Sequence, residues 1–159
     1  MTGNEPFARL HPVSLGVYNR PEWTLRVDRG SNMNDSIGKL ILRLTLGILI
    51  LLHGMAKLKG GVGGLTGAVT GAGLPAFFTY AVYIGEVLAP ILVLLGWYSR
   101  IGAGLIAINM LFAFTLVHGG ELFALDKTGG WALELQGMFL FTAIALALLG
   151  PGRFSLNGK

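Results

Sequence analysis

The residues of this sequence best able to carry chemistry are ionisable side chains inside long apolar stretches. Glu86 lies near the middle of the apolar stretch 76–97, and His53 lies deep in the stretch 37–58. An ionisable group at membrane depth is costly unless it pairs, becomes neutral or meets water. Glu86 is the strongest single candidate, because at that depth its carboxylate needs a cation, a hydrogen-bond donor or a proton.

Pro90 follows Glu86 by about one helical turn. Proline has no amide hydrogen, so it cannot donate the bond that would otherwise satisfy the carbonyl of Glu86 in an α-helix. We therefore predict a kink at this turn, with a free backbone acceptor beside the carboxylate.

The stretch 37–58 carries its polar and small residues on one helical face. At about 100° per residue, the following positions share a single arc: Arg43, Gly47, Ile50, His53, Gly54 and Lys57. Small residues allow close helix contact in membranes, so this face is predicted to point into the bundle while leucine and isoleucine face lipid. An alternative stays open for the two long cations, in which Arg43 and Lys57 each extend toward the nearer interface.

Ionisable residues also lie at the facing ends of the apolar stretches 100–118 and 131–149. In an antiparallel bundle these ends meet the C-terminal half of the first helix, which predicts a polar pocket in that half. The pocket would contain His53, Lys57, Glu86, His118 and Glu134.

Two other polar residues are interpreted differently. Gln136 lies about 200° from Glu134 around a helix, so both cannot face the centre equally. Glu134 is favoured, because an acid in the first turn suits the helix dipole. Asn109 points roughly opposite His118 and is interpreted as a helix-packing hydrogen bond.

Two interpretations of the pocket remain open: it binds a quinone headgroup or another small molecule, or its ion pairs only lock the bundle. Haem is not supported, because His53 lies several residues deeper than His118. No pair of these residues has metal-ligand spacing either. The glycine-rich run 60–67 lacks the strand, lysine and helix of a phosphate loop and is predicted to be a mobile loop with a short interfacial helix.

The elements that must position these residues are transmembrane helices. Charged residues make up 13% of the 159 residues and apolar ones 53%, and the mean hydropathy is +0.65. Four windows reach the length of about 20 residues that spans a bilayer: 37–58, 76–97, 100–118 and 131–149. The predicted fold is an all-α, integral membrane, antiparallel four-helix bundle.

Cysteine is absent, so any redox role needs a bound cofactor or a partner protein. Lysine and arginine are spread along the chain, which argues against nucleic acid binding. Positively charged flanks place both termini in the cytoplasm. Residues 1–32 contain three prolines and no apolar period, so they are predicted to form a disordered tail before the domain 33–159. The composition change at residues 33–36 suits either an authentic start or a helix N-cap, and both remain open.

The ordered motifs of residues 33–159 resemble the DoxX family of membrane proteins. These motifs are Arg43-Leu-x-Leu-Gly47, His53-Gly54-x-x-Lys57-Leu58, Gly73-Leu74-Pro75, Gly85-Glu86, Leu95-Gly96-x-x-x-Arg100 and the run from Leu149-Gly150-Pro151-Gly152 to Leu156. The chain is similar also to DoxX-like quinol oxidase subunits of bacterial inner membranes. The resemblance implies a four-helix membrane protein, in a family that includes the small subunit of a thiosulfate:quinone oxidoreductase and members linked to thiol and oxidative-stress complexes. It supplies no catalytic residues, because fold-level analogy does not transfer an activity.

The favoured hypothesis is an accessory subunit of a quinone- or thiol-linked redox system. In it His53 or Lys57 would hydrogen-bond a quinone carbonyl, and Glu86 would exchange a proton. Two alternatives are a non-enzymatic membrane scaffold or assembly protein, and a small-solute transporter. Transport would require a homo-oligomer, because four helices are few for a gated path.

Overall fold

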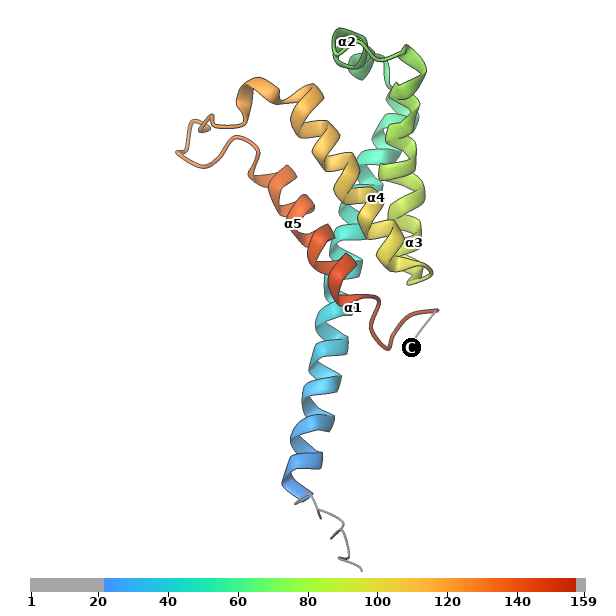
Figure 1. Ribbon diagram of the computed structural model, residues 1–159, viewed down its shortest axis with the longest axis vertical. Helices are drawn as coiled ribbons and strands as arrows, with labels where there is room; N and C mark the ends of the chain where they lie inside the picture. Colours follow the sequence, from blue (N-terminus) through green and yellow to red (C-terminus); the bar gives the residue numbers. More distant parts are fainter. Residues whose placement is uncertain (1–21, 157–159) are drawn as a thin grey trace, which may run out of the picture.

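The computed structural model describes residues 22–156, with side chains from residue 33 onward. The elements in chain order are the helices α1 (Glu22–Gly60) and α2 (Gly63–Gly71), the 3₁₀-helix η1 (Ala76–Ala81), the π-helix η2 (Ile84–Leu88), α3 (Ala89–Leu95), α4 (Ser99–Phe112), the π-helix η3 (Ala113–Val117), the 3₁₀-helix η4 (Gly119–Glu121) and α5 (Glu134–Leu149). The described fold is an all-α bundle (Figure 1). The prediction of the fold class is thus confirmed.

Within residues 22–156, three helical stretches are long and apolar enough to cross a membrane: Met33–Gly60, Ala76–Leu95 and Ser99–Val117. The fourth predicted span is represented by the shorter apolar helix Glu134–Leu149. It begins later than the predicted residue 131, because Trp131 forms an isolated antiparallel bridge with Leu125. The chain is therefore a helical membrane protein, and its described part contains three long candidate spans and a shorter fourth apolar helix.

Helix α1 also extends beyond the predicted span. Residues 1–21 of the predicted disordered tail lie outside the described residues, whereas the backbone of residues 22–32 continues α1. The helix thus passes through Met33 without a break, and residues 33–36 do not cap a helix. The division of the chain at residue 33 stays a prediction.

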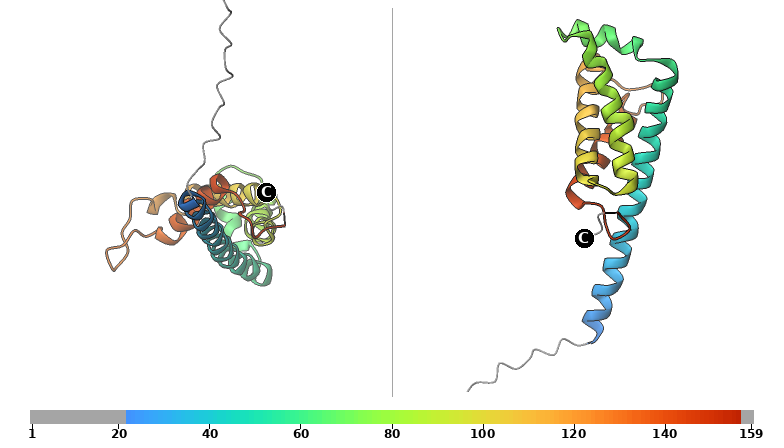
Figure 2. Two further views of the ribbon diagram at one scale, coloured as in Figure 1. Left: turned by 90° about the horizontal axis from the view of Figure 1, so that it is seen from below. Right: turned by 90° about the vertical axis from the view of Figure 1, so that its right-hand side faces the viewer.

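Helices α3 and α5 pack on α1, and α4 packs on α3 and α5. Helix α3 lies beside the upper half of α1, whereas α5 slants away from α1 toward the loop that precedes it (Figures 1 and 2). Helix α2 covers one end of the bundle, and the loop between α4 and α5 projects from its side. The buried core includes Leu46, Ile50, Val93, Ile106 and Leu146.

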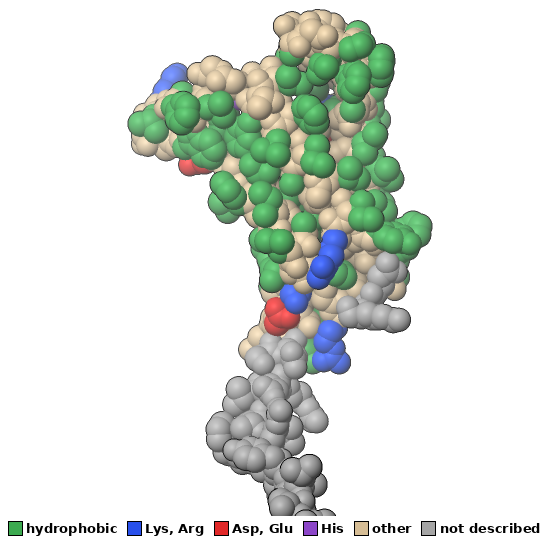
Figure 3. Space-filling view, in the orientation of Figure 1, with side chains coloured by type: hydrophobic (Ala, Val, Ile, Leu, Met, Phe, Trp, Pro, Cys, Tyr) green, Lys and Arg blue, Asp and Glu red, His purple; other side chains and the backbone are tan. Residues whose placement is uncertain are grey.

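Apolar side chains also cover the outside of the bundle (Figure 3). Exposed residues such as Ile41, Leu52 and Ile108 recur along the helices. In the space-filling view, charged groups gather at the lower end of the bundle and at the projecting loop. This distribution is that of a surface solvated by lipid along the helices and by water at their ends.

Arg43 joins three parts of the fold at the end opposite α2. Its side chain is fully buried, with 1% of the residue exposed. The guanidinium donates hydrogen bonds to the carbonyls of Val93 (2.9 Å), Leu94 (2.9 Å), Pro151 (3.0 Å) and Phe154 (2.7 Å). The alternative in which Arg43 extends to an interface is therefore wrong. The last carbonyls of a helix lack the regular intrahelical donor. The Arg43 side chain donates to two carbonyls at the end of α3, of which that of Val93 also accepts the amide of Gly96.

Glycine at position 96 makes room for that guanidinium. Gly96 ends α3 in the left-handed region, with φ of 70°. A Cβ there would overlap the guanidinium of Arg43 and the side chain of Ser155. Three motifs seen in the sequence therefore contact one another here: the first-helix motif that begins at Arg43, the pair Leu95-Gly96 and the C-terminal run.

Candidate functional site

The centre of the candidate site is an ion pair between α1 and η2. Lys57 Nζ lies 2.5 Å from both carboxylate oxygens of Glu86. The Glu86 side chain is 6% exposed and that of Lys57 is 27% exposed. Lys57 is thus the cation that the buried carboxylate was expected to need, and its partial exposure keeps one side of the pair accessible.

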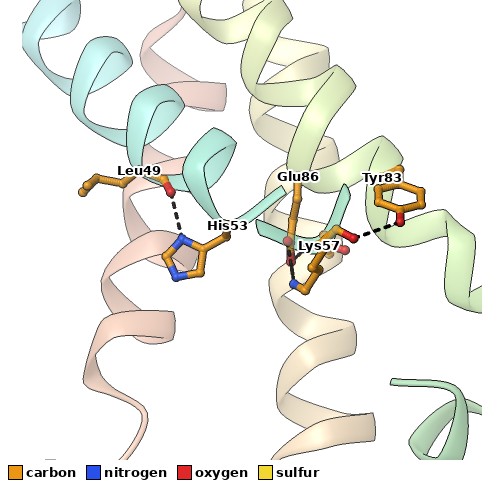
Figure 4. A network of polar contacts seen from close by, with 6 residues as sticks. Leu49, His53, Lys57, Tyr83 and Glu86 are labelled. Atoms are coloured by element: carbon orange, nitrogen blue, oxygen red, sulfur yellow. Dashed lines mark hydrogen bonds and ion pairs between the residues drawn. The ribbon is translucent and has the colours of Figure 1, made fainter. Parts of the chain in front are cut away.

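Two neighbours complete this polar cluster. Asn109 Nδ2 on α4 donates to Glu86 Oε1 at 3.3 Å. The Tyr83 hydroxyl donates to the Lys57 carbonyl at 3.2 Å, as Figure 4 shows. Asn109 does form an interhelical hydrogen bond, as interpreted from the sequence, but its partner makes it part of the site. Its signal in the sequence was an amide in the middle of an otherwise apolar span.

Glycine 54 allows α1 to approach η2 closely enough for the ion pair to form. A Cβ at Gly54 would overlap the backbone carbonyl of Glu86, so only glycine fits there. Lys57 follows one turn later on the same face and reaches the carboxylate. The stripe of small and polar residues predicted on the first helix thus has a specific purpose at this point.

The local backbone around Glu86 is a π-helix. The amide of Ala89 donates to the carbonyl of Ile84, in the wider π pattern. Pro90 cannot donate to the carbonyl of Glu86, and that carbonyl lies against Gly54 of α1. A Cα–H group facing a carbonyl in this way is a weak donor. The acceptor predicted beside the carboxylate therefore faces the neighbouring helix.

Gly85 has the matching role toward α4. A Cβ at Gly85 would overlap the side chain of Asn109, so the absent side chain gives the amide its place beside Glu86. The pair Gly85-Glu86, recognised in the sequence as a motif, therefore combines a charged group with the space for its partner.

A cavity of about 260 Å³ opens beside this cluster. Its polar lining comes from Lys57, Thr79, Glu86 and Asn109, and its walls are mostly apolar residues of α2, η1, α4 and η3. Both π-helices, η2 and η3, border it. Such π segments are frequent at functional sites. An apolar chamber with a few convergent polar groups is the usual form of a small-molecule site.

Three residues of the predicted pocket lie elsewhere. His53 is exposed and its Nδ1 lies 2.8 Å from the Leu49 carbonyl, while its ring contacts Phe139 on α5 edge-on, with centroids 5.7 Å apart. Figure 4 shows it pointing away from the ion pair. His118 pairs with Glu121 at 2.8 Å.

Glu134 is exposed, and its carboxylate makes no hydrogen bond or ion pair within residues 33–156. The predicted convergence failed because α5 slants away and residues 118–133 form a projecting loop. Of the predicted pocket, Lys57 and Glu86 are the residues that meet. No group of three or more His, Asp or Glu side chains in the described part of the chain could hold a metal ion.

The fold and the cavity define a small multi-pass membrane protein with a polar cluster buried between its helices. Comparison with known proteins specifies the class further. The DoxX family model matches residues 38–119, a stretch that includes Lys57, Glu86 and Asn109. The chain belongs to the DoxX family.

Two relatives extend this comparison. The chain is 32% identical over 128 residues to a Bacillus subtilis protein named "Putative oxidoreductase CatD", and the match covers 79% of this chain and 89% of that protein. It is 27% identical over 122 residues to an "Uncharacterized protein" of Haemophilus influenzae, covering 74% of this chain and 87% of the relative. No solved structure shows a significant match.

Proposed function

We propose that this chain is an inner-membrane subunit of a quinone-linked redox system, and that its cavity binds the quinone headgroup. The observation that carries the proposal is the cavity itself, in which the Lys57–Glu86 pair and Asn109 form a polar patch in an apolar chamber. A quinone has the same division, with carbonyl oxygens on an apolar ring and tail. The name of the Bacillus subtilis relative agrees with a redox role.

The polar groups suit the needs of a quinone that becomes a quinol. Lys57 and Asn109 carry N–H groups that can donate to a carbonyl oxygen, and Glu86 can accept from a quinol hydroxyl. Reduction adds two electrons and two protons to the quinone. The chain has no cysteine, so the electrons would come from a partner protein or a bound cofactor, and Glu86 would lie on the path of a proton.

The first experiment measures quinone bound to the purified protein. Wild-type protein in mild detergent should retain quinone that organic solvent extracts, and an azido-quinone should label cavity residues in a way that excess quinone prevents. Glu86→Gln should lower both signals severalfold. Glu134→Gln is the matched control, because it makes the same chemical change at an exposed acid outside the cavity. Absence of saturable labelling in wild type, or equal labelling of Glu86→Gln, refutes the proposal.

A scaffold that uses Lys57 and Glu86 only for packing is the competing function, and Arg43 shows that this chain does use one buried charge for packing. The double variant Lys57→Met with Glu86→Leu separates the two. Replacing a buried pair by apolar residues of similar size is often neutral for stability. We expect the double variant to fold and to lose quinone. A folded double variant that binds quinone and supports wild-type quinone reduction in membranes favours the scaffold.

A further inference from the structure

Thr79 carries a buried hydroxyl for which the fold provides no partner. It lies in η1, the residue is 3% exposed, and its Oγ1 makes no hydrogen bond within the described residues. A buried polar group without a partner is costly. Ser99 has the same deficiency, but Ser99 does not line the cavity, whereas Thr79 does.

The position of Thr79 relative to Glu86 is set by the helix that contains both. The stretch Ala76–Leu95 is one continuous helical segment, and Thr79 precedes Glu86 by about two turns, or roughly 10 Å along the axis. Two turns also bring the residues to similar faces of the helix. The residues that line the cavity therefore include the polar cluster of Lys57, Glu86 and Asn109 and, about two turns away along the helix, Thr79.

The length of this gap suits a flat ring with polar atoms at both ends. Two hydrogen bonds of about 2.8 Å each would occupy roughly half of the 10 Å. The remainder is the size of a six-membered ring with opposed oxygens. Apolar side chains that line the cavity, among them Leu105, Ile108 and Phe112, would contact the faces of such a ring.

From this geometry we infer that Thr79 is a second anchor for the ligand and donates a hydrogen bond to the carbonyl opposite the one held near Lys57. The inference rests on the proposed function and deepens it, because it makes the site selective for 1,4-quinones over ketones with one carbonyl. The ligand carbonyl would then be the hydrogen-bond acceptor for the Thr79 hydroxyl, which has no partner in the described residues.

The test combines protein variants with a matched pair of ligands. Thr79→Val keeps the shape and removes the hydroxyl, Thr79→Ser keeps the hydroxyl, and Ser99→Ala removes the other unpartnered hydroxyl away from the cavity. The ligands are a decyl-substituted 1,4-naphthoquinone and the corresponding 1-tetralone, which lacks the second carbonyl. Affinity is measured by calorimetry on protein in lipid nanodiscs, and the thermal stability of the ligand-free protein is recorded for each variant.

Wild type, Thr79→Ser and Ser99→Ala should bind the quinone about fivefold more tightly than the tetralone, the value of one neutral hydrogen bond. Thr79→Val should bind both ligands alike and be at least as stable as wild type without ligand, because it loses an unpartnered polar group. If wild type and Thr79→Val prefer the quinone over the tetralone by the same factor, while Glu86→Gln binds the quinone more weakly, the role of Thr79 is refuted and the proposed function stands. If wild type binds neither ligand, the proposed function fails with it.

Discussion

Replacement of Arg43 by methionine tests whether this single side chain holds the C-terminal segment to the bundle. Methionine fills similar space with apolar atoms and removes the guanidinium that donates to Val93, Leu94, Pro151 and Phe154. The Val93 carbonyl also accepts the amide of Gly96 at 3.1 Å. The Val93 carbonyl therefore keeps one donor when the guanidinium is removed, whereas the carbonyls of Leu94, Pro151 and Phe154 lose the donor that Arg43 supplies.

The expected loss follows from those three carbonyls. Each hydrogen bond contributes about 1 kcal/mol or more when the donor is charged, so Arg43→Met should lower the free energy of unfolding by about 3 kcal/mol. Arg43→Lys should lose roughly 2 kcal/mol, because an ammonium group cannot reproduce the planar fork of five donors. We expect the segment after α5 to detach before the helices unfold, because the carbonyls of Pro151 and Phe154 belong to that segment.

Two assays measure the effect. Denaturation by titration with SDS in mixed micelles, followed by circular dichroism, gives the free energy of unfolding. Limited trypsin digestion after Arg153, which is exposed, reports release of the C-terminal segment and should be faster in Arg43→Met. Lys59→Met is the control, because Lys59 is an exposed cation on the same helix. An Arg43→Met protein that unfolds within about 1 kcal/mol of wild type, with unchanged cleavage, would refute the reasoning.

Two further predictions concern packing and pH. Gly54→Ala should lower the free energy of unfolding by about 2 kcal/mol or more in the same SDS titration, because the new Cβ would overlap the Glu86 carbonyl. Gly60→Ala is the control and should stay within about 1 kcal/mol of wild type, because a Cβ at Gly60 would contact nothing. Equal losses in the two variants would contradict the close approach of α1 to η2. The Thr128 hydroxyl and then its amide hold the pKa of Asp126 below the ordinary value, so this loop contact stabilises the fold above the unfolded-state pKa and is lost as pH falls through the folded one. Thr128→Val should raise the midpoint of an NMR titration of that carboxyl, and an unchanged midpoint would count against it.

The sequence by itself determined the membrane helices and the need of Glu86 for a partner. Hydrophobic runs of sufficient length can only be helical in lipid, because every backbone polar group must be satisfied internally. The stripe on the first helix also followed from the 3.6-residue period. In the half of the first helix predicted to meet Glu86, that stripe contained two basic residues, His53 and Lys57, and periodicity alone could not decide which of them pairs with Glu86.

The tertiary structure determined which basic residue pairs with Glu86 and which residues form the site. Close approach at Gly54 aligned Lys57 with Glu86, while the tilt of α5 left His53 beside Phe139. The period of a helix fixes which residues share its face, but helix tilt, crossing angle and axial register depend on packing between helices.

The same reason explains Arg43, Asn109 and Thr79. An arginine near the start of the predicted span 37–58 can reach an interface or a neighbouring carbonyl, and only the path of the C-terminal segment decided in favour of Pro151 and Phe154. Asn109 entered the site because Gly85 leaves space for it. An unpartnered hydroxyl at Thr79 is a property of three-dimensional surroundings, which no pattern along the chain records.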